Sequence, residues 1–171
     1  YSAGILGGYM AYKTPKTWIV GEMVTAAMMN QNVRDNVSEV FKRANTKTLI
    51  INVFTEDVLL VENDATPAHS FPIPMELNGA KLINAAAVVN IPSTSGLPEI
   101  RVHNLTNDTA MLSTNITIDQ NEKTSYTATT PMAINTANDT VTTGQRVGMY
   151  VKVKGTDTRG LDVILTFMVQ S

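Results

Sequence analysis

The sequence contains no cysteine among its 171 residues, so it can form neither a disulfide framework nor a thiolate metal site. A single tryptophan and two histidines leave few candidates for an aromatic sugar platform or a general base. Thirteen basic and fifteen acidic residues give a net charge of -2, which provides no basic footprint for nucleic acid. No apolar run approaches the roughly 20 residues of a membrane-spanning helix. We therefore expect neither nucleic acid nor a membrane as a partner.

The chain is long enough for one domain with a substantial core and a small appendage, since 43% of its residues are hydrophobic. Residues 1–16 combine small residues and Pro15 without any periodicity, which is typical of an irregular leader. The glycines of this leader lack the spacing of a phosphate-binding loop. The first segment with a clear periodic pattern therefore begins after the leader.

An amphipathic helix is predicted after Thr25, whose hydroxyl can accept a hydrogen bond from a free backbone N–H at the helix start. From Ala26 onward, apolar side chains recur at steps of three and four, which places them on one helical face. This apolar stripe consists of Met29, Val33, Val37, Val40 and Phe41. The stripe must be buried, either against the protein's own domain or against a partner.

From residue 46 onward the pattern changes to short β-compatible segments separated by turn residues. The segments span residues 48–54, 58–61, 81–91, 99–105, 110–118, 124–129, 146–153 and 161–169. Such a series predicts a mainly β fold, an antiparallel β-sandwich or jelly-roll-like domain. We expect Asn78 and Gly79 to form a tight turn, and residues 155–160 to join the last two strands as a hairpin. The predicted organisation is a leader and short α-helical anchor segment over 1–45, followed by the β domain over 46–171.

The last predicted strand has an apolar residue at every second position, which defines a core face. These residues are Leu161, Val163, Leu165, Phe167 and Val169. Ile164 and Met168 on the opposite face also favour some cover. A central strand covered by its own chain explains this pattern, and so does a strand at a subunit interface.

The two histidines lack the sequence signature of a catalytic base. His69 lies in a proline-flanked segment that is typical of a loop or an edge strand. His103 lies in an alternating strand, where we expect its side chain to face solvent. Because nucleophilic catalysis needs a base with convergent partners, we predict that the protein is not an enzyme and has no catalytic residue.

Acidic residues occur in pairs that could serve acid–base catalysis, but they lie between strands, where carboxylates are most often solvated. The pairs are Glu56 with Asp57, Glu62 with Asp64, and Asp157 with Asp162. The segment "DQNE" at 119–122 lacks the glycine and the distal glutamate of a calcium loop. The sequence therefore predicts no metal site and no cofactor.

Two segments of the sequence resemble proteins of one known class. The residues "TPKTWIVGEMVTAAMMNQNVRDNV" at 14–37 are similar to a stretch near the N-terminus of structural proteins of tailed-bacteriophage virions, with the pattern T-W-x-x-G-E-x-V-T-A-x-x-M-N-x-x-V-R-D-N. The ending "TGQRVGMYVKVKGTDTRGLDVILTF" at 143–167 also resembles the final strands of phage tail, fibre or head-decoration β domains. The resemblance implies a virion structural protein.

The resemblance further implies a homo-oligomer, with a trimer favoured, located in the virion as a tail, fibre or capsid-surface protein. We expect attachment to sister subunits or to tail, portal-proximal or capsid proteins through Trp18, Met29, Val33, Val37 and Phe41. An alternative function is recognition of a host surface glycan through loops of the β domain, although few loop residues besides Phe71 and Tyr126 are aromatic. The alternative to attachment is that the amphipathic helix folds back over its own β-sandwich and contacts no partner.

Overall fold

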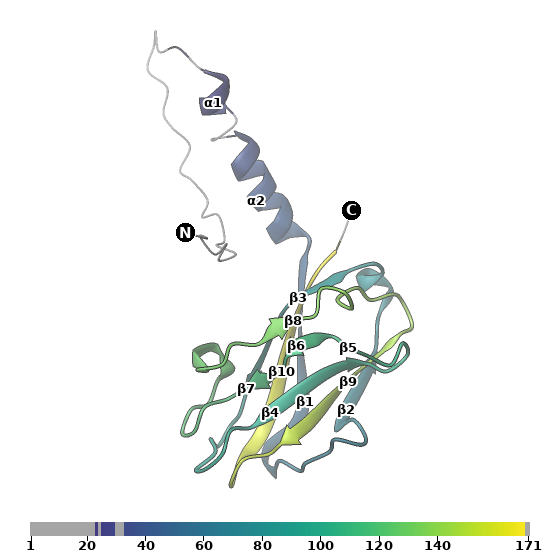
Figure 1. Cartoon of the computed structure of the whole chain (residues 1–171). Coiled ribbons are helices and arrows are strands. Elements are labelled where there is room, and N and C mark those ends of the chain that lie inside the picture. The colour runs from purple at the N-terminus through teal and green to yellow at the C-terminus, as the bar shows by residue number, and fades with distance from the viewer. Residues whose placement is uncertain (1–22, 24, 30–32, 170–171) are drawn as a thin grey trace. The chain divides into compact units, whose positions relative to one another are not determined.

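The computed structural model describes residues 23, 25–29 and 33–169 (Figure 1). The chain divides into two compact units, Tyr1–Asn45 and Thr46–Ser171, and each is described by itself. In its described residues, the first unit contains helices α1 (Ala26–Met29) and α2 (Asp35–Ala44). The backbone N–H of Asn45 donates to the Phe41 carbonyl at 3.1 Å and closes the end of α2. Asn45 is thus the one residue between α2 and the first strand.

The second unit is mainly β, and all its strand pairs are antiparallel, which confirms the predicted fold class. The first sheet has the order β1-β10-β3. The second has the order β2-β9-β4-β5, with β7 also paired to β4, and β6 pairs with β8. The strands are β1 (Thr46–Leu59), β2 (His69–Pro72), β3 (Lys81–Val88), β4 (Glu99–Asn104), β5 (Thr109–Ala110), β6 (Leu112–Thr114), β7 (Ile116–Thr117), β8 (Ala133–Ile134), β9 (Arg146–Val153) and β10 (Arg159–Met168).

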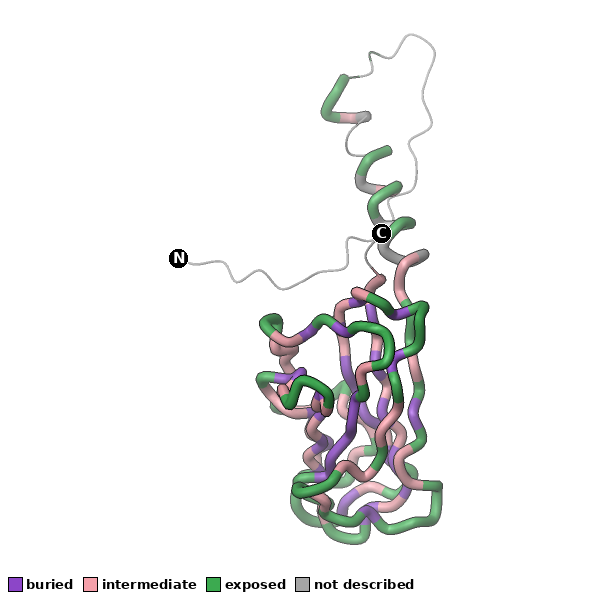
Figure 2. The backbone as a smooth tube through the Cα atoms, turned by 90° about the vertical axis from the view of Figure 1, so that its right-hand side faces the viewer, coloured by how far each residue is buried: buried purple, intermediate pink, exposed green. Residues whose placement is uncertain are grey.

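The two larger sheets contribute to one core, as expected of a sandwich. Figure 2 shows the buried residues concentrated on the strands and the exposed residues on the connecting loops. From the first sheet, the core includes Ile51, Leu82, Ala85, Ala87, Leu161, Val163, Leu165 and Phe167. From the second sheet it includes Ile100, Val102, Val147, Met149 and Val151. Alternate residues of each strand thus face the same interior.

Strand β10 lies in the middle of its sheet and confirms the predicted core face. Leu161, Val163, Leu165 and Phe167 are all buried, while the intervening residues from Asp162 to Met168 are half-buried. In register with β10, Ile50 of β1 and Ala86 of β3 flank Ile164 on the opposite face. The chain itself therefore covers one face of β10 fully and the other in part.

The predicted final hairpin is wrong, because β9 and β10 lie in different sheets. Both strands have an inner row of apolar residues, and both rows face the one core from opposite sides. The connection between them therefore crosses from one sheet to the other instead of turning back within one. Gly155 in this connection has a φ of +68°, and the hydroxyls of Ser93 and Thr158 lie where its Cβ would be. Glycine is required there both for the backbone conformation and for space.

Two of the other predicted strands are also wrong. Residues 58–61 do not form a separate strand, since Val58 and Leu59 continue β1 beyond two register shifts. Residues 124–129 do not form a strand either. Instead, the Thr124 hydroxyl accepts a hydrogen bond from the Tyr126 N–H at 3.3 Å and caps the short 3-10 helix η3 (Ser125–Thr127). This local side-chain bond competes with strand formation.

The predicted turn at Asn78 and Gly79 is confirmed. It follows the 3-10 helix η2 (Met75–Leu77), and Gly79 has a φ of +72°. The Asn78 side-chain oxygen accepts a hydrogen bond from the Thr143 N–H at 3.1 Å, so the turn is also tied to a distant loop. Glycine adopts the positive φ without the steric cost of a Cβ.

Candidate functional site

The predicted cap of the N-terminal helix is present. The backbone N–H of Met28 donates to the Thr25 hydroxyl at 3.3 Å, at the start of α1. This bond satisfies one of the backbone donors that the first helical turn leaves free. The sequence therefore specified where the helix begins, although α1 covers only residues 26–29 and residues 30–32 lie outside the description.

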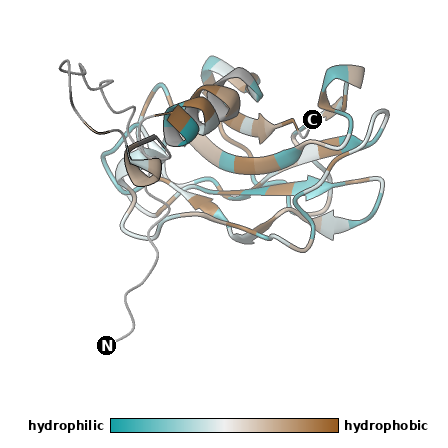
Figure 3. Cartoon of the chain, turned by 90° about the horizontal axis from the view of Figure 1, so that it is seen from above, coloured by the Kyte–Doolittle hydropathy of each residue, from teal (hydrophilic) through white to brown (hydrophobic). Residues whose placement is uncertain are grey.

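The apolar stripe of the N-terminal unit is exposed where the structure describes it. Val33, Val37, Val40 and Phe41 have exposed fractions of 50%, 60%, 57% and 55%, respectively. Figure 3 shows strongly hydrophobic and hydrophilic residues together on α2, as expected of an amphipathic helix. Trp18 lies outside the described residues, and so does the side chain of Met29 in α1. The attachment role of these residues stays a prediction.

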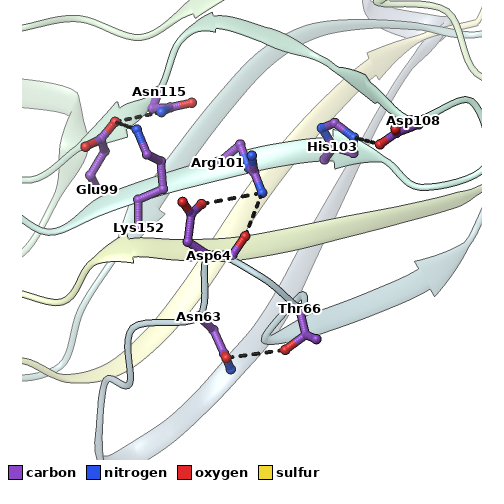
Figure 4. Close-up of polar contacts among 9 residues, drawn as sticks. All are labelled: Asn63, Asp64, Thr66, Glu99, Arg101, His103, Asp108, Asn115 and Lys152. Atoms are coloured by element: carbon purple, nitrogen blue, oxygen red, sulfur yellow. Dashed lines mark hydrogen bonds and ion pairs between the residues drawn. The ribbon is translucent and has the colours of Figure 1, made fainter.

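A row of ionisable residues follows strand β4 on the outside of the second sheet. Glu99, Arg101 and His103 alternate with buried Ile100 and Val102, so they share the face turned away from the core (Figure 4). The alternating sequence "EIRVHN" contains this signal, because side chains two residues apart in a strand point the same way. We did not predict the row, since its partners come from other segments of the chain.

Glu99 is held by two partners from outside its own strand. Asn115 donates its side-chain N–H to Glu99 Oε1 at 2.6 Å, and Lys152 Nζ of β9 lies 3.2 Å from the same oxygen. The hydrogen bond from Asn115, with a smaller contribution from Lys152, lowers the pKa of Glu99, although partial burial opposes this shift. Glu99 therefore stays ionised to lower pH than an ordinary glutamate and is unsuited to be a general acid near neutrality.

Arg101 covers an aromatic ring. Its guanidinium carbon lies 4.2 Å from the ring centroid of Tyr150, its neighbour on β9, in a cation–π contact. The same guanidinium donates to the carbonyl oxygen of Asp64 at 3.2 Å and lies 3.5 Å from its carboxylate. Because Tyr150 is only 7% exposed, its ring is not open for stacking on a sugar. This site gives no support to the glycan-binding alternative.

The structure corrects the expectation that His103 faces solvent. Its side chain is only 13% exposed, and Nε2 lies 3.0 Å from Asp108 Oδ1, in the turn that follows β4. The ring of Tyr150 also packs edge-on against the imidazole, with centroids 6.0 Å apart. The histidine–aspartate pair joins the strand to the turn, and none of the described hydrogen bonds brings a hydroxyl to the other ring nitrogen, Nδ1. His69 lies on the edge strand β2 and is exposed, in agreement with its predicted position.

The structure places Glu56 and Asp162, from two of the sequence pairs, on the lining of one cavity. Asp119 and Glu122, from the segment compared with a calcium loop, bond to threonines nearby in the chain. Asp119 accepts hydrogen bonds from the Thr129 hydroxyl and N–H at 2.6 and 2.9 Å, and these bonds lower its pKa. Glu122 accepts a hydrogen bond from the Thr127 hydroxyl. These three hydrogen bonds shape the loop around η3. Among the described residues, no group of three or more histidine, aspartate or glutamate side chains is placed to hold a metal ion.

On the described part of the β unit, two of the cavities can be considered as sites. One has a volume of about 110 Å³ and lies beside Asn52, Asn90 and Asp162. This is well below the roughly 300–1,000 Å³ of typical small-molecule sites. The other, about 310 Å³, lies along residues 154–158, next to Leu59 and Leu60. It is lined mainly by the connection between β9 and β10, which includes Lys154 and Asp157.

The chain matches no known protein-family model, no curated protein and no solved structure. Within the described residues, no helix is both long and apolar enough to cross a membrane.

Proposed function

We propose that the protein is a non-enzymatic structural component of a tailed-phage virion, either a tail, fibre or capsid-surface protein. It assembles as a homo-oligomer and attaches through its N-terminal unit. The observation that carries this proposal is the exposed apolar stripe of Val33, Val37, Val40 and Phe41. Full burial of an exposed side chain of this kind contributes roughly 1.5–3 kcal/mol. Because these four are 50–60% exposed, a partner surface that covers them gains about half of that from each.

The arrangement of the β unit supports the same proposal. Two ionisable residues of strand β4 have ionisable partners, namely Glu99 with Lys152 and His103 with Asp108. These contacts link strands and loops of one rigid unit. A β domain preceded by an amphipathic helix with an exposed apolar stripe suits a protein that decorates or extends a larger particle.

The main competing explanation is that the helix covers its own β unit. It predicts that the β unit loses stability when the helix is removed, whereas attachment to a partner predicts that only assembly is lost. The two explanations therefore differ in a measurable way.

The experiment removes residues 1–44 and compares the truncated chain with the full chain in thermal melting and in copy number in purified virions. We expect a folded β unit that no longer enters particles. Normal incorporation of the truncated chain would refute the attachment role, and loss of folding would show that the helix belongs to the core of the β unit.

Point variants test the stripe itself. Replacing Val37 and Phe41 together by serine is expected to reduce the copy number without lowering the melting temperature of the β unit. Ser38→Ala is the matched control, because Ser38 is also exposed on α2 but is not part of the stripe. Trp18→Ala is expected to act in the same direction as the serine variant, since buried aromatic residues often dominate interfaces and can contribute about 2 kcal/mol or more.

A further inference from the structure

Strand β1 has one unpaired edge. It lies at the end of the order β1-β10-β3 and pairs with β10 only, so its other side has no strand partner in the described part of the chain. Residues 47–52 pair with β10 in unbroken register and contain neither proline nor a bulge. A regular unpaired edge of this kind is a template for another strand.

The two halves of β1 differ in how their edge is protected. Beyond Asn52 the strand has two register shifts, and it carries the charged residues Glu56 and Asp57. Bulges and charges are the usual protection of an edge against pairing. Lys47 is the only charged residue in the first half, at its very start.

The first half also exposes an apolar side chain next to the free edge. Ile50 is 71% exposed and lies in one row with Ile164 and Ala86. Polar pairs border this row on both sides. Thr48 and Thr166 place their hydroxyls 3.3 Å apart, and Asn52 donates to Asp162 at 2.9 Å. Ile164 covers Ile50 from one side only, so an added strand would cover the other.

We propose that a second copy of this chain pairs its β1 with this edge, antiparallel, about a two-fold axis at Ile50. In this register Ile50 lies opposite Ile50 of the second copy, and Thr48 lies opposite Asn52. Lys47 is the only charged residue of 47–52, so no two like charges face each other within this regular segment. An opposed pair of β-branched side chains stabilises an antiparallel ladder, whereas opposed like charges destabilise it. The segment is thus complementary to itself.

This contact involves the β unit alone and goes beyond the proposed attachment through α2. A two-fold contact is different from the three-fold assembly that the resemblance implies, and both can occur in one particle. Failure of one proposal therefore leaves the other standing.

A cysteine at position 50 tests the register directly, because the natural chain has no cysteine. Opposed residues of an antiparallel pair have Cα atoms roughly 4.5–5.5 Å apart, which is within the range of a disulfide. We expect the full-length Ile50→Cys chain to form a disulfide-linked dimer under mild oxidation on a non-reducing gel. Ser113→Cys is the control, since Ser113 is exposed on β6 and has nearly the same shape as cysteine. Equal cross-linking of the two variants would overturn the proposal.

The mass of the full chain in solution, measured by light scattering, tests the contact without a cross-link. We expect twice the chain mass of 18.5 kDa, or an even multiple of it. Ile50→Lys places like charges opposite each other and is expected to halve this mass, whereas Ile50→Thr retains it. Melting temperatures of both variants show that they are folded. A monomeric natural chain, or a lysine variant with unchanged mass, would show that the edge does not pair with itself.

Discussion

Replacing Phe167 by alanine tests the core of the β unit at its centre. Phe167 is fully buried on β10, the middle strand of the first sheet, and lies in register with Leu82 of β3. Its ring belongs to the core that both sheets share. The substitution leaves the backbone pairing of β10 intact and removes only the side chain from the interior.

The expected cost has two parts. Loss of the buried aromatic side chain removes about 1.5–3 kcal/mol of transfer free energy. A residual cavity of roughly 80 Å³ adds about 2 kcal/mol at ~24 cal/mol per Å³. We therefore expect the free energy of unfolding to fall by about 3–5 kcal/mol. Phe167→Leu keeps much of the volume and is expected to cost less than about 1.5 kcal/mol.

Urea unfolding followed by far-UV circular dichroism measures both variants against the natural chain. The midpoint should shift strongly for alanine and weakly for leucine, with the slope unchanged. A change within about 0.5 kcal/mol for Phe167→Ala is the size of an ordinary surface substitution and would refute the assignment of the inner face. A native spectrum dominated by helix would contradict the mainly β fold itself.

Two further predictions concern the loops and the ionisable row. Gly155→Ala is expected to reduce the free energy of unfolding by about 2–4 kcal/mol, because the new Cβ combines an unfavourable positive φ with overlap of the Ser93 hydroxyl. Gly144→Ala also has a positive φ but open space around the Cβ, so it should cost only about 1–2 kcal/mol. Thermal melting of the two variants compares these costs. Because Asn115 lowers the folded-state pKa of Glu99, this carboxylate adds stability above its unfolded pKa and loses it as pH falls through the folded value. Glu99→Gln should therefore reduce the loss of urea stability between neutral and acidic pH, and an unchanged pH dependence would contradict the role of that contact.

For much of the candidate site, the sequence predicts which residues share one face of a helix or strand, but not which residues of other segments they contact. The steps of three and four from Val33 to Phe41 predict a stripe, because side chains at these spacings share a helical face. The row of Glu99, Arg101 and His103 has the spacing of one strand face in the same way. Their partners could not be predicted, since Asp64 and Lys152 come from distant segments that only folding brings to β4.

The sequence by itself determined the fold class and the inner face of β10. An apolar residue at every second position from Leu161 to Phe167 can bury one continuous face only as a strand. The capping hydroxyl of Thr25 and the positive φ of Gly79 are likewise local properties, fixed by side-chain chemistry within a few residues.

Tertiary structure alone decided which strands pair. The turn residues between β9 and β10 allow a hairpin, but β9 lies between β2 and β4 and β10 lies between β1 and β3, so the two strands bury their apolar rows from opposite sheets. β10 pairs instead with β1, which joins Thr46 to Met168 across most of the chain. Local chemistry cannot specify such a pairing, because its free energy comes from burying two distant apolar faces together and appears only when the whole core forms.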